Sequence, residues 1–319
     1  ATVGAGCQIK RLLKELARDG TTLHSHGLIT EQTIAGAIST GTHGSGRHSM
    51  SHYVVAVRLA RYDASSGRAI IEEITAGEQL QAARCSLGSL GIILAVTVRC
   101  RPQYNVQEHF SEYRQLSDVL AAEESFPLQQ FFLIPWRWSY FSQHRCEQPG
   151  PRSLLAGLYR VYWLLVMDLG MHLLVLLLVR LLQSRSAIRC AFRHLVPLFV
   201  IRNWKVTDRS SSMLVMKHEA FRHIEIELFV PRDQLADALR FTHEIIKVAG
   251  GKESTLSAVN QQRIDDLGMQ EDLDGLQNQY CHHYPICVRR VLPDDTLISM
   301  ASGGEQDWYA LSFISYANP

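Results

Sequence analysis

The sequence predicts an α+β protein of two parts, with an apolar helical insert in the second part. Short β-branched runs and amphipathic helical stretches follow one another over the first hundred residues. Near residue 104 the residue pattern changes, and strand-like and helix-like segments then recur as far as residue 316. The most apolar stretch of the chain is 154–183. We therefore expect a first part at 1–103 and a second part at 104–319, with the insert at 154–205.

The elements of the first part are predicted from periodicity and turn residues. Ile9, Leu12 and Leu16 lie at helical spacing and are followed by Gly20, which predicts a helix over 8–19. The same reasoning predicts a strand, a turn, a returning strand, a helix and a final strand, in that order, at 53–62, 63–67, 69–74, 78–86 and 92–99.

The second part is expected to mix strands and helices in a less regular order. The segment 136–152 is rich in Trp, Arg, Gln and Pro, and no strand is predicted there. Strands are predicted at 106–110, 130–134, 224–230, 286–292 and 308–316. Helices are predicted near 115–124 and at 233–248, the latter stopped by Gly250 and Gly251.

Composition narrows the class of protein. Apolar residues at 46% and charged residues at 20% exclude a disordered chain, and 319 residues suffice for two domains. A net charge of +1 gives no indication of a nucleic-acid partner. Seven cysteines without a Cys-x-x-Cys pair favour a reducing compartment over a disulfide scaffold or a zinc site. No signal-peptide pattern follows Ala1, and we expect both ends to be cut from a longer protein.

A glycine-rich loop is the first candidate binding element. Five glycines lie between Gly27 and Gly46, interleaved with Ser and Thr, so the backbone can approach a ligand and offer N–H groups to phosphate. The loop matches neither the P-loop nor the dinucleotide fingerprint, and a simple tight-turn region is the alternative. The loop fixes no common helical face for His43, His48 and His52, so we expect no metal site there.

Three separated stretches carry a resemblance to a known family. They are Val-Gly-Ala-Gly at 3–6, Ala-Gly-Ala-Ile-Ser-Thr-Gly-Thr-His-Gly-Ser-Gly at 35–46, and Ser-Leu-Gly-Ser-Leu-Gly-Ile-Ile-Leu-Ala-Val-Thr-Val-Arg at 86–99. Together they resemble the second half of the FAD-binding domain of the vanillyl-alcohol-oxidase flavoprotein superfamily. Within it they are similar to the aldonolactone oxidase branch, which includes L-gulonolactone, D-arabinonolactone and alditol oxidases. The rest of the chain would then be the substrate, or cap, domain.

The resemblance implies a cofactor and the residues that contact it. FAD would lie with its pyrophosphate and ribityl chain along Thr33, Gly36, Ala37, Ile38 and Ser39. The loop would continue beside the flavin through Thr40, Gly41, Thr42, His43 and Gly44, and the adenosine end would contact Ile92 and Ile93. The first phosphate loop of the superfamily, and the histidine that often bonds FAD, precede the matching part, so the sequence assigns no covalent attachment.

The apolar insert suggests a membrane surface. Residues 161–179 nearly reach bilayer-spanning length, but Asp168 and His172 make a clean span costly. Between 169 and 207 there is no acidic residue and there are six cations, of which Arg185, Arg189 and Arg193 recur every four residues. This composition favours an interfacial anchor, with a buried core or oligomer interface and a true span as alternatives. Residues 203–212 and 217–231 also resemble the animal gulonolactone oxidases, which are microsomal membrane proteins.

The substrate side is predicted near the end of the chain. Residues 284–316 resemble the cap sheet that faces the flavin, where sugar-oxidising relatives present a Glu-x-Arg pair. The matching positions here are Cys287 and Arg289, which share one face of a strand. A fixed guanidinium can hold a substrate oxygen during hydride transfer, so Arg289 is the stronger catalytic candidate. For Cys287 a packing role is the simpler interpretation.

The resulting hypothesis is an FAD-dependent oxidoreductase that oxidises a CH–OH group of a sugar lactone or polyol, with oxygen or another electron acceptor. Residues 1–319 alone would then be inactive, because half of the cofactor cradle lies outside them. Two alternatives stay open. The enzyme could act on another alcohol, because the expected Glu is replaced, or the chain could be a non-catalytic, membrane-associated homologue.

Overall fold

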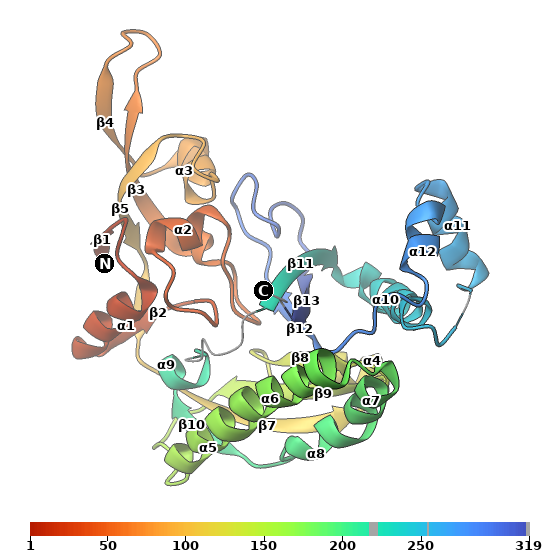
Figure 1. Ribbon diagram of the computed structural model, residues 1–319. Coiled ribbons are helices and arrows are strands. Elements are labelled where there is room, and N and C mark those ends of the chain that lie inside the picture. Colours follow the sequence, from red (N-terminus) through yellow and green to blue (C-terminus); the bar gives the residue numbers. More distant parts are fainter. Residues whose placement is uncertain (217–222, 254, 317–319) are drawn as a thin grey trace.

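A first antiparallel sheet and its helices form the N-terminal part of the molecule. The computed structural model describes residues 1–216, 223–253 and 255–316 (Figure 1). The strands of this sheet, in spatial order, are β1 (Thr2–Gly4), β5 (Ile92–Val98), β3 (Val54–Tyr62) and β4 (Ala69–Ile74). The helices are α1 (Ile9–Arg18), α2 (Ile34–Ser39) and α3 (Gly77–Arg84). Ile9, Leu12, Ile34, Val57 and Val96 form the core between them because their apolar faces converge there.

A seven-stranded antiparallel sheet organises the second part. A short pair, β2 (Thr21–Leu23) and β6 (Cys100–Pro102), leads into it from the first part. The seven strands, in spatial order, are β10 (Val206–Arg209), β7 (Asn105–Tyr113), β9 (Ser139–Glu147), β8 (Gln130–Ile134), β12 (Ile286–Val291), β13 (Trp308–Tyr316) and β11 (His223–Pro231).

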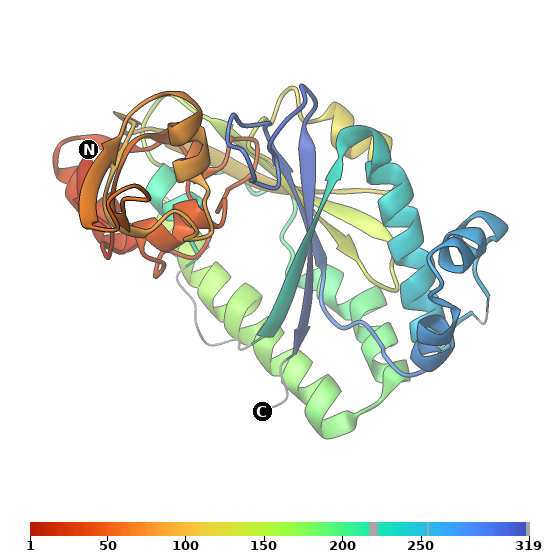
Figure 2. The ribbon, with the colours of Figure 1, turned by 90° about the horizontal axis from the view of Figure 1, so that it is seen from above.

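The two faces of the large sheet have different partners. Val288 and Leu311 lie on the face that packs against the insert and against α10 (Leu235–Ala249). The opposite face meets the N-terminal part, where Gly46 N–H donates to the carbonyl of Arg290 at 2.6 Å. Figure 2 shows the sheet strands crossing above the insert helix and the N-terminal part standing beside them. The second face is therefore the one that can contribute to a site between the two parts.

The insert is one long helix followed by a shorter antiparallel return. The apolar helix runs over Ala156–Leu182. Gln183, with a positive φ of 47°, turns the chain, and the Ser184 hydroxyl caps the next helix by accepting from Ala187 N–H. The helices of this region are α5 (Ala156–Tyr162), α6 (Met171–Leu176), α7 (Arg185–Cys190) and α8 (Val196–Phe199). The remaining helices of the second part are α4 (Leu116–Ala121), α9 (Ser210–Met213), α11 (Ala258–Asp266) and α12 (Gln270–Leu276).

The structure agrees with most of the predicted elements and adds strands that were not predicted, among them the short β2, β6 and β10 and the long β9. β9 occupies the segment where no strand was expected. Polar residues occupy many of its buried positions, including Ser142, Gln143, His144 and Arg145. The strand therefore lacks the alternation of apolar and polar residues from which strands are predicted. These polar groups are paired inside the sheet, as in the bond from Arg145 Nε to Glu108. Helices α11 and α12 were also not predicted. Residues 217–222, within a stretch that resembles the gulonolactone branch, lie outside the described residues.

Candidate functional site

A row of side chains from three neighbouring strands faces the N-terminal part. In the register of the sheet, Glu227 on β11 and Cys287 on β12 both lie opposite Ser312 on β13. Arg289 follows two residues after Cys287 and therefore projects from the same face. The N-terminal part adds His43, which is 4% exposed and comes from the glycine-rich loop. The structure thus brings together Cys287, Arg289 and His43 from the predicted set and adds Glu227 and Ser312.

Glu227 is the centre of this cluster. Its Oε1 atom accepts from Arg289 Nη2 and from Ser312 Oγ, the latter at 2.9 Å. Its Oε2 atom lies 3.2 Å from His43 Nε2. Position 287 is Cys and not the glutamate expected from the sugar-oxidising relatives. The carboxylate beside Arg289 is instead supplied by Glu227, from another strand. A signal was present in the predicted strand 224–230, where Glu225 and Glu227 alternate with Ile224, Ile226 and Leu228.

The glycine-rich loop reaches the sheet because its backbone is attached to the end of β12. Besides the Gly46 bond, Leu292 N–H donates to the Arg47 carbonyl at 3.1 Å. Gly46 has a φ of 68°, and a Cβ there would lie 1.7 Å from the Pro127 carbonyl oxygen, so only glycine fits. The buried Asp294 carboxylate accepts from Ser49 at 2.7 Å. These contacts fix where His43 meets Glu227.

The charges in the cluster follow from these contacts. Burial would raise the pKa of Glu227, but the hydrogen bond from His43 and the charges of Arg289 and His43 outweigh it and lower the pKa to about 2. The Glu227 carboxylate is therefore ionised at neutral pH. His43 Nδ1 faces the Gly44 carbonyl at 2.8 Å while Nε2 faces the carboxylate. Both partners of the His43 ring are hydrogen-bond acceptors.

Cys287 differs from its charged neighbours. Burial is the main cause that raises the pKa of its thiol, to about 12. A thiol with that pKa stays protonated at neutral pH, and only the thiolate would act as a base or nucleophile. The structure therefore favours a packing role for the small, neutral Cys287 side chain over a role in proton transfer.

A small cavity lies beside Arg289. It has a volume of about 20 Å³ and is lined by Arg289, His26, Arg47, Gln130 and Arg145, among others. That volume holds one oxygen-sized group. Arg289 Nε, Arg47 Nε and His26 Nε2 are buried and have no hydrogen-bond partner within the described part of the chain. Buried donors in native structures nearly always have a partner, so these atoms indicate a place for an oxygen that the chain itself does not supply.

The residues predicted along the cofactor lie on and around α2. Thr33 is the N-cap of this helix, and its hydroxyl accepts from Gly36 N–H at 3.3 Å. Ala37 and Ile38 are fully buried in the core, whereas Thr33, Gly36 and Thr40 are exposed and Ser39 is half-buried. Gly41 and Thr42 turn the chain towards His43, with the Thr42 N–H bonded to the Ala37 carbonyl at 2.9 Å. Ile92 is 71% exposed, and Ile93 is half-buried.

The surface around α2 fits FAD. Backbone bonds join 5 to 94, 35 to 5 and 87 to 39, so three sequence-distant stretches form one surface. A Cβ on Gly4 or Gly6 would meet nothing within 4 Å, and on Gly36 it would meet only the Thr33 hydroxyl. These glycines leave open space above the backbone, which a dinucleotide lying across it requires. Gly44 and Gly46, in contrast, are needed for packing within the chain, at His26 and Pro127.

The histidines of the loop go to different partners. His48 Nδ1 donates to the Pro293 carbonyl at 2.7 Å, and its ring stacks on His52 with centroids 4.0 Å apart. His52 lies 3.1 Å from the Asp295 carboxylate. Among the described residues, no group of three or more His, Cys, Asp or Glu side chains could hold a metal ion.

The fold of this molecule is shared with solved structures of other proteins. The protein titled "Solvent-stable cholesterol oxidase" superposes with a TM-score of 0.65 at 13% identity, covering 98% of this chain and 64% of that one. A family model described as an FAD binding domain matches residues 1–66. The molecule therefore has the fold of an FAD-binding domain of the vanillyl-alcohol-oxidase type followed by a cap domain.

Sequence relatives then give the family. The "Long-chain alcohol oxidase" of an uncultured marine euryarchaeote is 76% identical over all 319 residues, which make up 67% of its length. The "L-gulono-1,4-lactone dehydrogenase" of Mycobacterium tuberculosis is 26% identical and aligns with 97% of this chain, or 64% of its own length. The "D-arabinono-1,4-lactone oxidase" of Debaryomyces hansenii is 33% identical over 48% of the chain. The chain belongs to this family of FAD-dependent oxidoreductases, and FAD is its cofactor.

Proposed function

We propose that the protein containing this chain oxidises the CH–OH group of a small-molecule alcohol at the Glu227–Arg289 cluster. The observation that carries the proposal is the juxtaposition of the Glu227 carboxylate with an Arg289 that lines an oxygen-sized cavity and whose buried Nε has no partner among the described residues. A hydroxyl group needs both an acceptor for its proton and a donor for its oxygen. The cluster offers both within one partly buried row, next to the loop that borders the FAD surface.

The reaction requires the loss of a hydride and a proton from the substrate. Bound FAD supplies the hydride acceptor, and its electrons pass on to oxygen or another acceptor. Arg289 holds the substrate oxygen through its Nε–H, and Ser312 orients the Glu227 carboxylate by donating to Oε1. Glu227 accepts the hydroxyl proton as the C–O bond becomes a C=O bond. A carboxylate with a pKa near 2 is a weak base, but a hydroxyl becomes strongly acidic while its carbon loses a hydride. Arg289 and His43 keep the carboxylate ionised before that moment.

An aliphatic alcohol is the substrate class we favour. The relative at 76% identity bears the name of a long-chain alcohol oxidase. Phe229 packs edge-on against His43 at 5.2 Å, and the neutral Cys287 thiol and Ala310 add apolar surface near the cluster. A polyol or lactone would instead require several further polar partners for its hydroxyl groups.

A sugar lactone is the second candidate, because several relatives carry lactone oxidase or dehydrogenase names. A substrate panel separates the two classes. We expect the flavin-loaded full-length protein to be reduced anaerobically by 1-alkanols, faster as the chain lengthens, and only slowly by aldonolactones or alditols. Rapid reduction by lactones alone would overturn the aliphatic assignment. A full-length protein that binds no flavin would instead favour a non-catalytic homologue.

A further inference from the structure

One long face of the insert is apolar and exposed. Met171, Val175 and Leu178 of the insert helix are buried against the large sheet. On the opposite side Leu173 and Leu181 are 52% and 68% exposed. The helix is long and apolar enough to cross a membrane, yet one of its sides is already occupied by protein. Lipid therefore cannot surround this helix on all sides while it packs against the sheet.

The spacing of the exposed leucines matches the geometry of the helix. They recur every four residues at 165, 169, 173, 177 and 181. An ideal α-helix has 3.6 residues per turn, so a four-residue repeat would drift around it. Wider π-type turns at Trp163–Gly170 and Leu177–Leu182 bring the repeat closer to four, and the leucines stay on one side.

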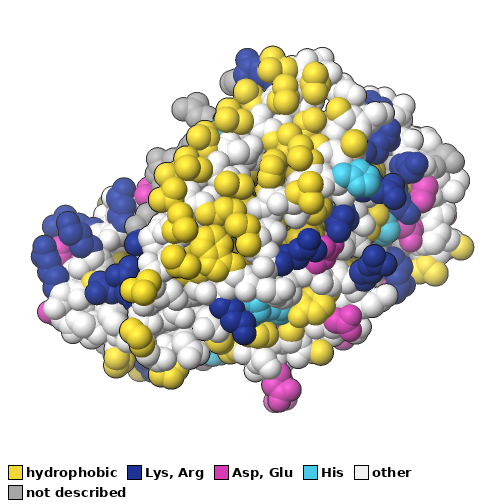
Figure 3. Space-filling view, turned by 90° about the horizontal axis from the view of Figure 1, so that it is seen from below, with side chains coloured by type: hydrophobic (Ala, Val, Ile, Leu, Met, Phe, Trp, Pro, Cys, Tyr) yellow, Lys and Arg dark blue, Asp and Glu magenta, His cyan; other side chains and the backbone are white. Residues whose placement is uncertain are grey.

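The apolar face continues onto the return helices. Leu195, Leu198 and Ile201 are 40%, 73% and 46% exposed. Figure 3 views this side of the molecule and shows apolar side chains gathered in a broad area, with Lys and Arg side chains along its border. A patch of this extent on a soluble protein marks an interaction site. We refer to the exposed residues of 154–201 as the leucine face.

The charges around the leucine face are almost all positive. No acidic residue occurs between 169 and 207, and Arg180, Arg193 and Lys205 are exposed. The predicted basic helical face is only partly available, however. Arg189 donates to the Gly250 carbonyl at 3.0 Å, and Arg185 contacts the Asn278 side chain. Only the third of the four-spaced arginines, Arg193, is therefore directed to solvent.

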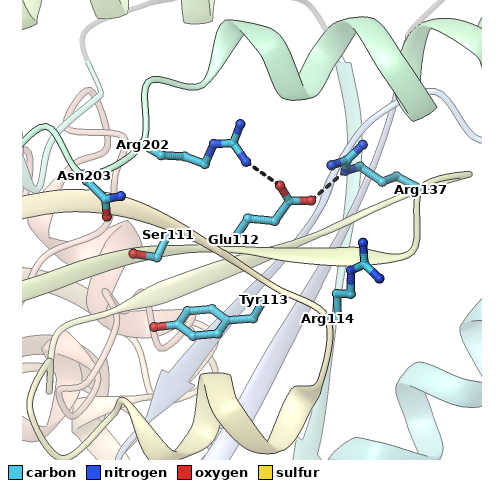
Figure 4. A pocket seen from close by; sticks show the side chains of 7 residues that line it. All are labelled: Ser111, Glu112, Tyr113, Arg114, Arg137, Arg202 and Asn203. Atoms are coloured by element: carbon cyan, nitrogen blue, oxygen red, sulfur yellow. Dashed lines mark hydrogen bonds and ion pairs between the residues drawn. The ribbon is translucent and has the colours of Figure 1, made fainter.

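An arginine-lined cavity lies next to the leucine face. Its volume is about 700 Å³, and Figure 4 shows Arg114, Arg137 and Arg202 around Glu112. Glu112 accepts from Arg137 Nε at 2.7 Å and from Arg202 Nη1 at 2.8 Å, which uses only part of their N–H donors. No acidic group among the described residues forms an ion pair with Arg114. Arg202 directly follows the exposed Ile201, so this positive cavity borders the apolar surface.

We infer that the leucine face docks on the surface of an anionic phospholipid bilayer, with the insert helix parallel to the membrane plane. The leucines would enter the acyl boundary, while Arg114, Arg193 and Lys205 meet lipid phosphates. Charge complementarity favours this occupant. A second copy of the chain would bring one cationic border against another, and so would have to bury like charges together.

Vesicle flotation of the flavin-loaded full-length protein tests this inference without any substrate. We expect binding to phosphatidylcholine vesicles that becomes tighter when phosphatidylglycerol is added. Leu181→Glu and Leu173→Glu should each weaken binding roughly tenfold, because each places a charge where the bilayer would bury a leucine. The matched control is Leu267→Glu, at a leucine that is 69% exposed on the distant α11 end and should leave binding unchanged.

The cationic border is tested separately. Arg114→Gln should weaken binding to phosphatidylglycerol-containing vesicles about fivefold and leave binding to phosphatidylcholine unchanged. Arg58→Gln, at an exposed position of the N-terminal part, is the matched control. Flavin content and melting temperature establish that each variant is folded. Absence of vesicle binding by the wild type overturns the inference. So does a dimer of the wild type that Leu181→Glu dissociates, because a second copy would then cover the face.

Discussion

Two regions of this molecule break the usual rule of apolar inside and polar outside, in opposite ways. The cluster around Glu227 largely buries charged groups between the loop at His43 and the large sheet, whereas the leucine face exposes apolar groups to solvent. Buried charges cost free energy unless they are paired, and exposed apolar surface costs it unless a partner covers it. The comparison is the basis of the two proposals, a reaction at the first region and docking at the second.

The largest expected effect is at Arg289. Arg289→Ala removes the proposed donor to the substrate oxygen and the guanidinium beside Glu227, so turnover should fall about a hundredfold or more, equivalent to about 3 kcal/mol. Arg289→Lys should recover little, because an ammonium lacks the planar fork. Steady-state rates at matched flavin content measure this. Near-full turnover of Arg289→Ala would mean that the cluster takes no part in the reaction. Membrane binding should be unaffected in both Arg289 variants.

A large effect on stability is expected at Gly46. Gly46→Ala would place a methyl group against the Pro127 carbonyl and would strain a positive φ, which should lower the free energy of unfolding by about 2–4 kcal/mol. Gly67→Ala, at an open turn with a similar φ of 63°, is the control for backbone strain alone and should cost about 1 kcal/mol. Thermal or denaturant unfolding compares them. Equal losses would mean that the loop does not pack against Pro127.

The acid dependence of stability is a third test. The pKa of Glu227 lies below its ordinary value, so its contribution is complete above about pH 4.5 and is lost as the pH falls towards 2. The wild type should therefore lose melting temperature more steeply over that interval than Glu227→Gln, and the two curves should converge at the acid end. Parallel curves would show that Glu227 is not held by His43 and Arg289.

The smallest effects are expected at Cys287. Cys287→Ser should change turnover by less than about tenfold, because the thiol is neutral and buried. Cys287→Glu should be worse than Cys287→Ser in both stability and turnover, since a second carboxylate would lie in the row beside Glu227 and share one arginine. A gain in activity for Cys287→Glu on lactones would favour the sugar-oxidising alternative. The turnover of both variants, measured in the same assay, distinguishes these outcomes.

The sequence predicted the strands that form the site better than the contacts within it. β-branched alternation located β11, β12 and β13, and the family resemblance located Arg289 and the loop containing His43. It could not predict the partner of Arg289, because Glu227 lies 62 residues away in the chain and becomes its neighbour only through the register of β13. Likewise, spacing predicted that Arg185 and Arg189 share a face, but their partners lie on a distant helix end and loop.

The central claim is that the substrate hydroxyl group is oxidised at the Glu227–Arg289 cluster. Stopped-flow measurement of anaerobic flavin reduction in Glu227→Gln tests it most directly, because this substitution keeps the shape of the side chain and removes only its charge and its capacity to take a proton. We predict reduction at least about a hundredfold slower than in the wild type, with flavin content and reoxidation unchanged. Reduction at the wild-type rate would contradict the account.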